Sequence, residues 1–224
     1  MGENIDYQGG TGYFAASGQE NAPGVVVIQE WWGVQDQIRS VCDQYAAAGF
    51  DALAPDLYSG VVVPYHDKAA AAREMEALDF LSATDRQVSA AAAFLARPGR
   101  KLGLTGFCLG GIVSILGAIR LDDFAAVSCY YGLPDLDQGL PEQVRLPVIG
   151  HFALDDTWCT PEMVDAYEAG LKRAGKDYVF YRYACDHGFF NPDIPEFHSE
   201  YAKLAWSRDL EFWSRHLKPA EPTS

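Results

Sequence analysis

The sequence predicts an α/β fold with a mostly parallel central sheet and helices on both of its faces. Short runs rich in β-branched and aromatic residues alternate along the chain with helical segments of ten or more residues. The run at residues 25–28 is apolar throughout, as is typical of a strand covered on both faces. Because 224 residues suit one domain of this kind, we expect a single domain over residues 1–218 and a loose tail over residues 219–224.

The first part of the chain is expected to contain edge strands, then two central strands joined by a helix. Glycine-rich turns within the first two dozen residues favour short edge strands. After the strand at residues 25–28, Asp36 is a candidate cap for a helix that Gly49 ends. The next strand is predicted at residues 50–55. This order already alternates strand, helix and strand.

A long alanine-rich segment follows at residues 66–97 and predicts helix. We expect an interruption near residues 82–85, with Thr84 or Asp85 as the cap of the second part. A Pro-Gly turn at residues 98–99 then leads into another apolar run. The segment therefore connects two strands of the sheet.

The second half of the chain repeats the alternation. Strands are expected at residues 102–107, 125–131, 146–152 and 178–183. Helices are expected at residues 112–118, from Thr160 to about Gly175, and at residues 196–217. The residues expected to anchor the last helix in the core are Phe197, Tyr201, Leu204 and Trp213.

Composition and charge exclude several classes of function. Lys and Arg number 17 against 31 Asp and Glu, which gives a formal charge of −14. A protein this acidic is a poor binder of nucleic acid or of anionic membrane surfaces. The N-terminus has no basic region followed by an apolar core, and no window approaches 18 uninterrupted apolar residues. We therefore expect a cytoplasmic protein without a signal peptide or a membrane span.

Five cysteines are scattered through the chain and never occur in C-x-x-C pairs. An odd number without paired spacing indicates neither a disulfide framework nor a zinc site. We therefore expect free thiols, with no metal and no cofactor. In such a chain, a single cysteine on a strained turn is a candidate nucleophile.

A cysteine bordered by glycines stands between a predicted strand and a predicted helix. Residues 106–110 read Gly-Phe-Cys-Leu-Gly, which fits the G-x-S-x-G pattern of a nucleophile elbow with sulfur in place of oxygen. Glycines suit a sharp turn whose neighbouring backbone leaves no room for a Cβ atom. Cys108 would lie at the N-terminus of the helix, where the partial positive charge favours a thiolate. A buried cysteine packed in a glycine-rich corner explains the pentapeptide equally well.

An acid and a histidine follow the ends of later predicted strands. Because the carboxyl ends of parallel strands meet at one edge of a sheet, Cys108, Asp156 and His187 are expected to project from the same edge. Their order along the chain is nucleophile, acid and histidine, which is the order of α/β-hydrolases. Asp155 is the alternative acid. The other four histidines are expected to be structural: His66, His151, His198 and His216.

The chain resembles the dienelactone hydrolase family of α/β-hydrolases. The matching segments span almost the whole chain in order: residues 23–30 with Gly33-Val34, residues 54–58, residues 106–111, Asp156 before Pro161-Glu162, and residues 187–189. The resemblance implies that Cys108 is the nucleophile, His187 the base and Asp156 the acid that orients it. It also implies that Glu30 lies beside the nucleophile, pairs with the thiol at rest and moves when substrate binds.

Backbone groups are the expected oxyanion donors. A thiolate that attacks an ester or lactone carbonyl forms a tetrahedral oxyanion, which needs preorganised hydrogen-bond donors. The N–H groups after the nucleophile and at the end of the first central strand are well placed, and we assign them to Leu109 and Trp31. Trp31, Trp32, Tyr58 and Phe189 are candidates for an aromatic substrate pocket, with core packing as the alternative.

The substrate-binding positions depart from the family pattern. Family members bind a substrate carboxylate with arginines, one of which stands four residues after the histidine, where this chain has Asn191. Arg73 is a candidate for the other arginine, and a solvated helix face is the alternative for it. The departure weighs against a carboxylate-bearing dienelactone as the substrate.

Our leading hypothesis is a hydrolase of small esters or lactones with a Cys108-His187-Asp156 triad. Dienelactone, an intermediate in the degradation of aromatic compounds, is one candidate substrate by resemblance. A thioesterase, a broad carboxylesterase or a peptidase with the same triad is the enzymatic alternative. A binding or redox-sensing protein that keeps the fold is the non-catalytic one. We expect a monomer or small homo-oligomer whose partner is a small molecule.

Overall fold

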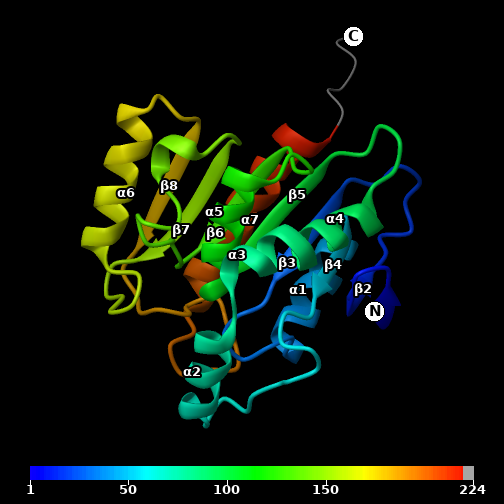
Figure 1. Cartoon of the computed structure of the whole chain (residues 1–224), viewed down its shortest axis with the longest axis horizontal. Coiled ribbons are helices and arrows are strands. Elements are labelled where there is room, and N and C mark those ends of the chain that lie inside the picture. Colours follow the sequence, from blue (N-terminus) through cyan, green and yellow to red (C-terminus); the bar gives the residue numbers. More distant parts are fainter. Residues whose placement is uncertain (219–224) are drawn as a thin grey trace.

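The computed structural model describes residues 1–218, and the tail expected at residues 219–224 lies outside the described residues. It contains one eight-stranded sheet with the strand order β1-β2-β4-β3-β5-β6-β7-β8 (Figure 1). The strands are β1 (Glu3–Tyr7), β2 (Gly10–Ala15), β3 (Gly24–Ile28), β4 (Asp51–Pro55), β5 (Leu102–Phe107), β6 (Ala126–Tyr130), β7 (Val148–Ala153) and β8 (Tyr178–Tyr183). The longer helices are α1 (Asp36–Ala47), α2 (Lys68–Ala77), α5 (Leu109–Arg120), α6 (Pro161–Arg173) and α7 (Ser199–Leu217).

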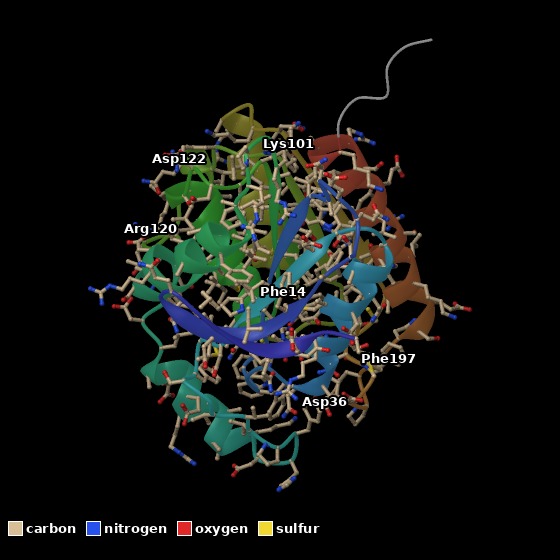
Figure 2. The ribbon with its side chains drawn as sticks, turned by 90° about the vertical axis from the view of Figure 1, so that its right-hand side faces the viewer. Phe14, Asp36, Lys101, Arg120, Asp122 and Phe197 are labelled. Carbon is tan, nitrogen blue, oxygen red and sulfur yellow. The ribbon has the colours of Figure 1, made fainter. Side chains whose placement is uncertain are left out.

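Six of the strands are parallel, and the α/β fold class predicted from the sequence is confirmed. Parallel pairing runs from β4 through β3, β5, β6 and β7 to β8. The first two strands form an antiparallel hairpin, which joins the sheet by antiparallel pairing of β2 with β4. Figure 2 shows this hairpin facing the viewer across the middle of the molecule, with Phe14 of β2 labelled. The edge strands expected in the first two dozen residues are therefore present.

Helices cover both faces of the sheet. On one face α1 and α7 pack against alternate strand residues, which include Val25 and Val27 of β3. On the other face α4 (Ser89–Leu95), α5 and α6 form a second cluster with the sheet, in which Val26 and Ile28 of β3 take part. Figure 1 shows α4 and α5 in front of the sheet and α7 behind it. Both sets of β3 side chains are buried, which explains why this strand is apolar throughout.

Two helix starts differ from the sequence expectation. Gln35 rather than Asp36 caps α1, and Asp36 is its first helical residue. The break in the alanine-rich segment falls at Asp79, whose carboxylate accepts from the Ser82 N–H at 3.0 Å. This cap starts α3 (Phe80–Ser82), a π-helical turn over residues 83–88, and then α4. The prediction of a cap at residue 84 or 85 is wrong, because both lie inside this helical stretch.

The last helix begins three residues later than expected, at Ser199, with His198 as its cap. Its predicted core anchors are partly wrong, since Phe197 and Leu204 are exposed. Trp213, in contrast, is fully buried against the sheet. Among residues 1–218, no helix is both long and apolar enough to span a bilayer.

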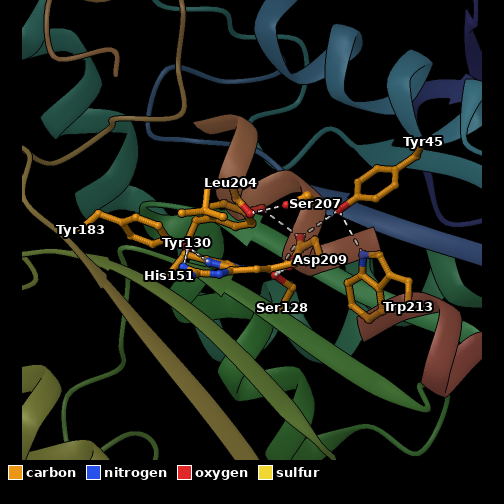
Figure 3. A network of polar contacts seen from close by, with 10 residues as sticks. Tyr45, Ser128, Tyr130, His151, Tyr183, Leu204, Ser207, Asp209 and Trp213 are labelled. Carbon is orange, nitrogen blue, oxygen red and sulfur yellow. Dashed lines mark hydrogen bonds and ion pairs between the residues drawn. The ribbon is translucent and has the colours of Figure 1, made fainter. Parts of the chain in front are cut away.

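A buried polar network fastens α7 to the sheet (Figure 3). Asp209 of α7 is fully buried, and His151 Nε2 lies 2.9 Å from its carboxylate. The hydroxyls of Ser128, Tyr130 and Tyr45 donate to the same carboxylate at 2.8, 3.0 and 3.2 Å. His151 is therefore a buried core residue that contacts Asp209, as the structural role predicted for it requires. Because four donors converge on one buried acceptor, removal of that acceptor leaves several polar groups unsatisfied.

We expect Asp209→Ala to lower the free energy of unfolding by about 3–5 kcal/mol, since it removes the acceptor of a buried charged network. The matched control is Glu211→Ala on the same helix. The carboxylate of Glu211 is 75% exposed, and within residues 1–218 Arg215 is its one ion-pair partner. The control should change the free energy of unfolding by about 0.5 kcal/mol or less. Urea denaturation followed by circular dichroism measures both, and equal effects of the two variants would contradict the role given to Asp209.

Candidate active site

Cys108 occupies a strained turn between β5 and α5. Its φ of 57° and ψ of −117° place a non-glycine residue in a sparsely populated region of backbone conformation. A Cβ atom on Gly106 would overlap the carbonyl of Gly110, and one on Gly110 would lie 2.6 Å from the carbonyl oxygens of Ile28 and Gln29. The glycines of the motif are therefore required by close backbone approach. The elbow expected from the sequence is present.

The main chain of Cys108 is also fixed by the neighbouring strand. Its N–H donates to the carbonyl of Tyr130 at 3.1 Å, and its own carbonyl accepts from Gly111 N–H at 2.9 Å. Cys108 is partly exposed, whereas the other four cysteines are buried. A partly exposed sulfur at a helix N-terminus is the environment in which a thiolate is reactive.

Asp156, rather than Asp155, is the aspartate that contacts His187. His187 Nδ1 lies 2.7 Å from Asp156 Oδ2. The other oxygen of Asp156 accepts from the N–H groups of Trp158 and Cys159 at 2.7 and 3.0 Å. Asp155 is exposed and faces the cavity described below. Asp156 is therefore held in place after the end of β7 by three hydrogen bonds, one of which joins it to His187.

The environment of His187 favours its protonated form. Burial lowers the pKa of His187, but contacts with Cys108 and Asp156 outweigh it and raise that pKa to about 10. An imidazolium beside a cysteine favours the thiolate. The ring of His187 also packs edge-on against Tyr131, with centroids 4.9 Å apart. The structure thus brings Cys108, His187 and Asp156 together at the carboxyl edge of the sheet.

Glu30 is buried at the end of β3, and both of its carboxylate oxygens are occupied. Oε1 accepts from the Tyr131 hydroxyl at 2.8 Å, and Oε2 accepts from the Asn191 amide at 2.6 Å. Burial raises the pKa of Glu30, and these two hydrogen bonds and the charge of His187 oppose the rise in part. Within residues 1–218, the resting contacts of Glu30 are thus to Tyr131 and Asn191 rather than to the thiol of Cys108.

Two residues of this arrangement were missed by the sequence analysis. The sequence predicts no site role for Asn191 beyond the absence of an arginine at that position. Asn191 is fully buried, and its amide donates a hydrogen bond to Glu30. Tyr131 directly follows β6, at the same edge of the sheet as Cys108, and has a φ of 36°. Its position at a strand end was the available signal. Aromatic residues at a strand end are equally consistent with core packing, so this position alone does not predict a role for Tyr131 in the site.

A cavity of about 460 Å³ opens beside Cys108 and His187. We call it the Cys108 cavity. It lies between α2 and the segment that joins β8 to α7, which Figure 1 shows beyond the edge of the sheet. Its aromatic lining consists of Trp31, Trp32, Tyr65 and Trp158.

The other proposed pocket residues lie outside this lining. Tyr58 is buried in the core, and its hydroxyl has no hydrogen-bond partner among the described residues. Phe189 is fully buried and packs on Tyr131. Arg73 is exposed on α2 and does not line the cavity, whereas Lys68 of the same helix does. Arg73 therefore lies on a solvated helix face, which is the alternative given for it above.

Two backbone N–H groups beside Cys108 and Glu30 lack a partner in the regular secondary structure of the described residues. Leu109 is the first residue of α5, so its N–H has no partner within the helix. The N–H of Trp31 has no hydrogen-bond acceptor within the described part of the chain. These are the two groups assigned to the oxyanion from the sequence, and that role stays a prediction.

Comparisons with known proteins agree with this geometry. The model of the dienelactone hydrolase family matches residues 11–217. The chain belongs to the dienelactone hydrolase family. It is 28% identical over 231 residues to "Protein usf" of Aquifex pyrophilus, covering 97% of this chain and all of the relative. It is 27% identical over 232 residues to "Putative carboxymethylenebutenolidase" of Aquifex aeolicus, with the same coverage.

A solved structure shows the same architecture. The crystal structure titled "Putative Dienelactone Hydrolase" from Klebsiella pneumoniae superposes with a TM-score of 0.84 at 26% identity. The match covers 96% of this chain and 98% of that one. The fold is therefore that of the α/β-hydrolases, and membership of the dienelactone hydrolase family makes the chain a carboxylic ester hydrolase.

The raised pKa of Glu30 predicts a pH-dependent stability. A carboxyl group with a raised folded-state pKa adds stability below its unfolded pKa, near 4.5, and loses it as pH rises through the folded pKa. We therefore expect Glu30→Gln to gain stability relative to wild type between pH 5 and pH 8. Thermal denaturation at the two pH values measures the difference. The control Glu20→Gln removes an exposed carboxylate, and a gain of the same size in the control would refute the assignment.

Proposed function

We propose that this enzyme hydrolyses small esters or lactones through a thioester on Cys108, with His187 and Asp156 as the other members of the triad. The observation that carries the proposal is the 2.7 Å contact between His187 and Asp156, with His187 and Cys108 lining one cavity. This contact fixes the orientation of the imidazole, so that its second nitrogen is left to transfer protons at Cys108. The same cavity has room for a small ester beside both groups.

In the first half-reaction, the Cys108 thiolate attacks the carbonyl carbon and forms the tetrahedral intermediate. The N–H groups of Leu109 and Trp31 stabilise its oxyanion. When the carbon–oxygen bond to the leaving group breaks, the His187 imidazolium gives its proton to the departing alkoxide. The acyl group then remains on sulfur as a thioester, and the imidazole is neutral.

In the second half-reaction, the neutral His187 removes a proton from water, and the resulting hydroxide attacks the thioester carbonyl. Collapse of the second tetrahedral intermediate releases the carboxylic acid and regenerates the thiolate beside an imidazolium. Asp156 stabilises that imidazolium in both halves without taking its proton. Glu30 is coupled to this charge, because the charge of His187 lowers the pKa of Glu30 against the effect of burial.

A lactone substrate is supported by the family and by the name of the Aquifex aeolicus relative. The residues of this chain favour a ring without a carboxylate. Asn191, at the position of a family arginine, is engaged with Glu30 and is not available to a substrate. Within residues 1–218, Lys68 is the one lysine or arginine that lines the cavity.

Acylation by an activated ester tests the mechanism. Mixing with excess p-nitrophenyl acetate should give a burst of nitrophenolate close to one equivalent, followed by slower turnover. Cys108→Ala should show neither phase while it keeps the wild-type circular dichroism spectrum. Full activity of this variant would contradict the proposal. A panel of lactone, thioester and peptide substrates then separates an esterase from a thioesterase or a peptidase.

The role of Asp156 has its own test. Asp156→Asn keeps the shape of the side chain but loses the charge that stabilises the imidazolium, so kcat should fall by about 10⁴-fold. Asp122→Asn is the control, because Asp122 is exposed and Arg145 is its one ion-pair partner among the described residues. A fall of less than tenfold in Asp156→Asn would remove Asp156 from the triad.

A further inference from the structure

The rim of the Cys108 cavity carries a marked excess of negative charge. Four carboxylates, which we call the rim carboxylates, come from the ends of β7 and β8 and from the segment before α7: Asp155, Asp186, Asp193 and Glu196. The only lysine or arginine in the lining described within residues 1–218 is Lys68. Over the whole chain the ratio is 31 acidic to 17 basic residues, so the rim is more acidic than composition alone predicts.

The rim carboxylates are not neutralised by neighbouring cations. Within the described residues, none of the four forms an ion pair with lysine, arginine or histidine. Asp193 accepts a long hydrogen bond from the hydroxyl of Tyr65, at 3.4 Å. Walls of low dielectric constant focus the field of such charges into the cavity. An anionic ligand would therefore be repelled from the mouth of the site.

The wall of the cavity is a continuous row of aromatic rings. Trp158 packs on Trp31 with centroids 5.3 Å apart, and Trp31 packs on Trp32 at 4.9 Å. Tyr65 extends the row from Trp32 at 5.3 Å. Trp158 is 60% exposed, an unusual state for so large an apolar side chain. Indole faces bounded by carboxylates are the environment that attracts organic cations.

We propose that the Cys108 cavity selects esters that carry a positively charged group, such as a substituted ammonium. The cation lies against Trp31 and Trp158 while the rim carboxylates supply the long-range attraction. The ester carbonyl reaches Cys108 from the same cavity. This substrate class rests on the proposed function of that site, and it differs from a substrate that is bound through its own carboxylate.

Charged thiol reagents test the selection without any turnover. We would measure the rates at which Cys108 reacts with two methanethiosulfonates, the cationic trimethylammonium-ethyl and the anionic sulfonatoethyl reagent. Each rate is divided by the rate at which the same reagent reacts with 2-mercaptoethanol, which corrects for the intrinsic reactivity of the reagent. Cys108→Ala gives the background. Burial raises the pKa of Cys129 and Cys185 to about 12 and that of Cys42 and Cys159 further, so these thiols react slowly. The normalised rate with the cationic reagent should exceed that with the anionic reagent by about tenfold or more in low salt. The difference should fall as added salt screens the rim carboxylates.

Matched charge variants separate the rim from the acidity of the whole protein. The triple variant Asp155→Asn, Asp186→Asn, Glu196→Gln should lose most of the cation preference. The control triple variant Glu3→Gln, Glu20→Gln, Asp123→Asn removes the same charge from exposed positions outside the lining and should keep the preference. Trp158→Leu, which changes no charge, should reduce the preference severalfold. Equal losses in the two triple variants, or a ratio near one in wild type, would overturn the proposal.

Turnover of three matched esters distinguishes this inference from the proposed function. The esters are phenyl acetate, 3-acetoxybenzoate and 3-(trimethylammonio)phenyl acetate, each corrected for its alkaline hydrolysis rate. We expect kcat/KM to rise from the anionic to the neutral to the cationic ester, by about tenfold or more across the series. Cys108-dependent turnover without charge preference would overturn the inference alone. Absence of all turnover with a preserved reagent ratio would overturn the proposed function alone.

Discussion

The close approach of backbone at the start of α5 is the constraint on which the rest of the site depends. Gly110 lies against the end of β3, and a Cβ atom on Gly111 would lie 2.7 Å from the carbonyl of Tyr130 at the end of β6. The helix can therefore start only where two strand ends leave room for it. Because Cys108 is the residue before that start, its strained conformation is imposed by packing from both sides. A looser corner would relax the turn and move the sulfur away from His187.

The end of β6 connects this corner to two buried carboxylates, Asp209 and Glu30. Tyr130 and Tyr131 are adjacent in the chain, and their hydroxyls donate to Asp209 and to Glu30 respectively. One hydrogen bond fastens the helix behind the sheet, and the other holds the carboxylate beside the site. Burial keeps the pKa of both tyrosines well above its usual value, so both remain donors. A single strand end thus contributes to stability and to the geometry of the site.

The sequence was sufficient for the fold class and for the strained turn at Cys108, because both follow from local patterns. Strand and helix periodicity reflects burial on one or two faces, and the elbow motif reflects a steric requirement that only glycines meet. Asp156 was preferred to Asp155 only through the resemblance to the family, because adjacent residues share the same strand end and only the packing of the following turn decides which one turns inward. Asn191 and Tyr131 were missed because their partner, Glu30, is distant in the chain.

Similar limits explain the errors in helical detail. Capping depends on which of several polar side chains reaches the first free N–H groups, and Asp79 does so although residues 84 and 85 fit the pattern equally well. The position of Arg73 depends on how α2 is turned about its axis, which weak amphipathicity in an alanine-rich helix does not determine. In both cases several conformations satisfy the local pattern, and tertiary contacts select one.

The position of Asp209 has a consequence for the order in which the chain can complete its fold. The donors that converge on this carboxylate come from α1, β6 and β7, all of which leave the ribosome before α7. Until residue 209 emerges, Tyr45, Ser128 and His151 have no acceptor at the place where the sheet would bury them. A nascent chain therefore gains little by closing this face early. The native packing of this face is therefore complete only when the last helix is present.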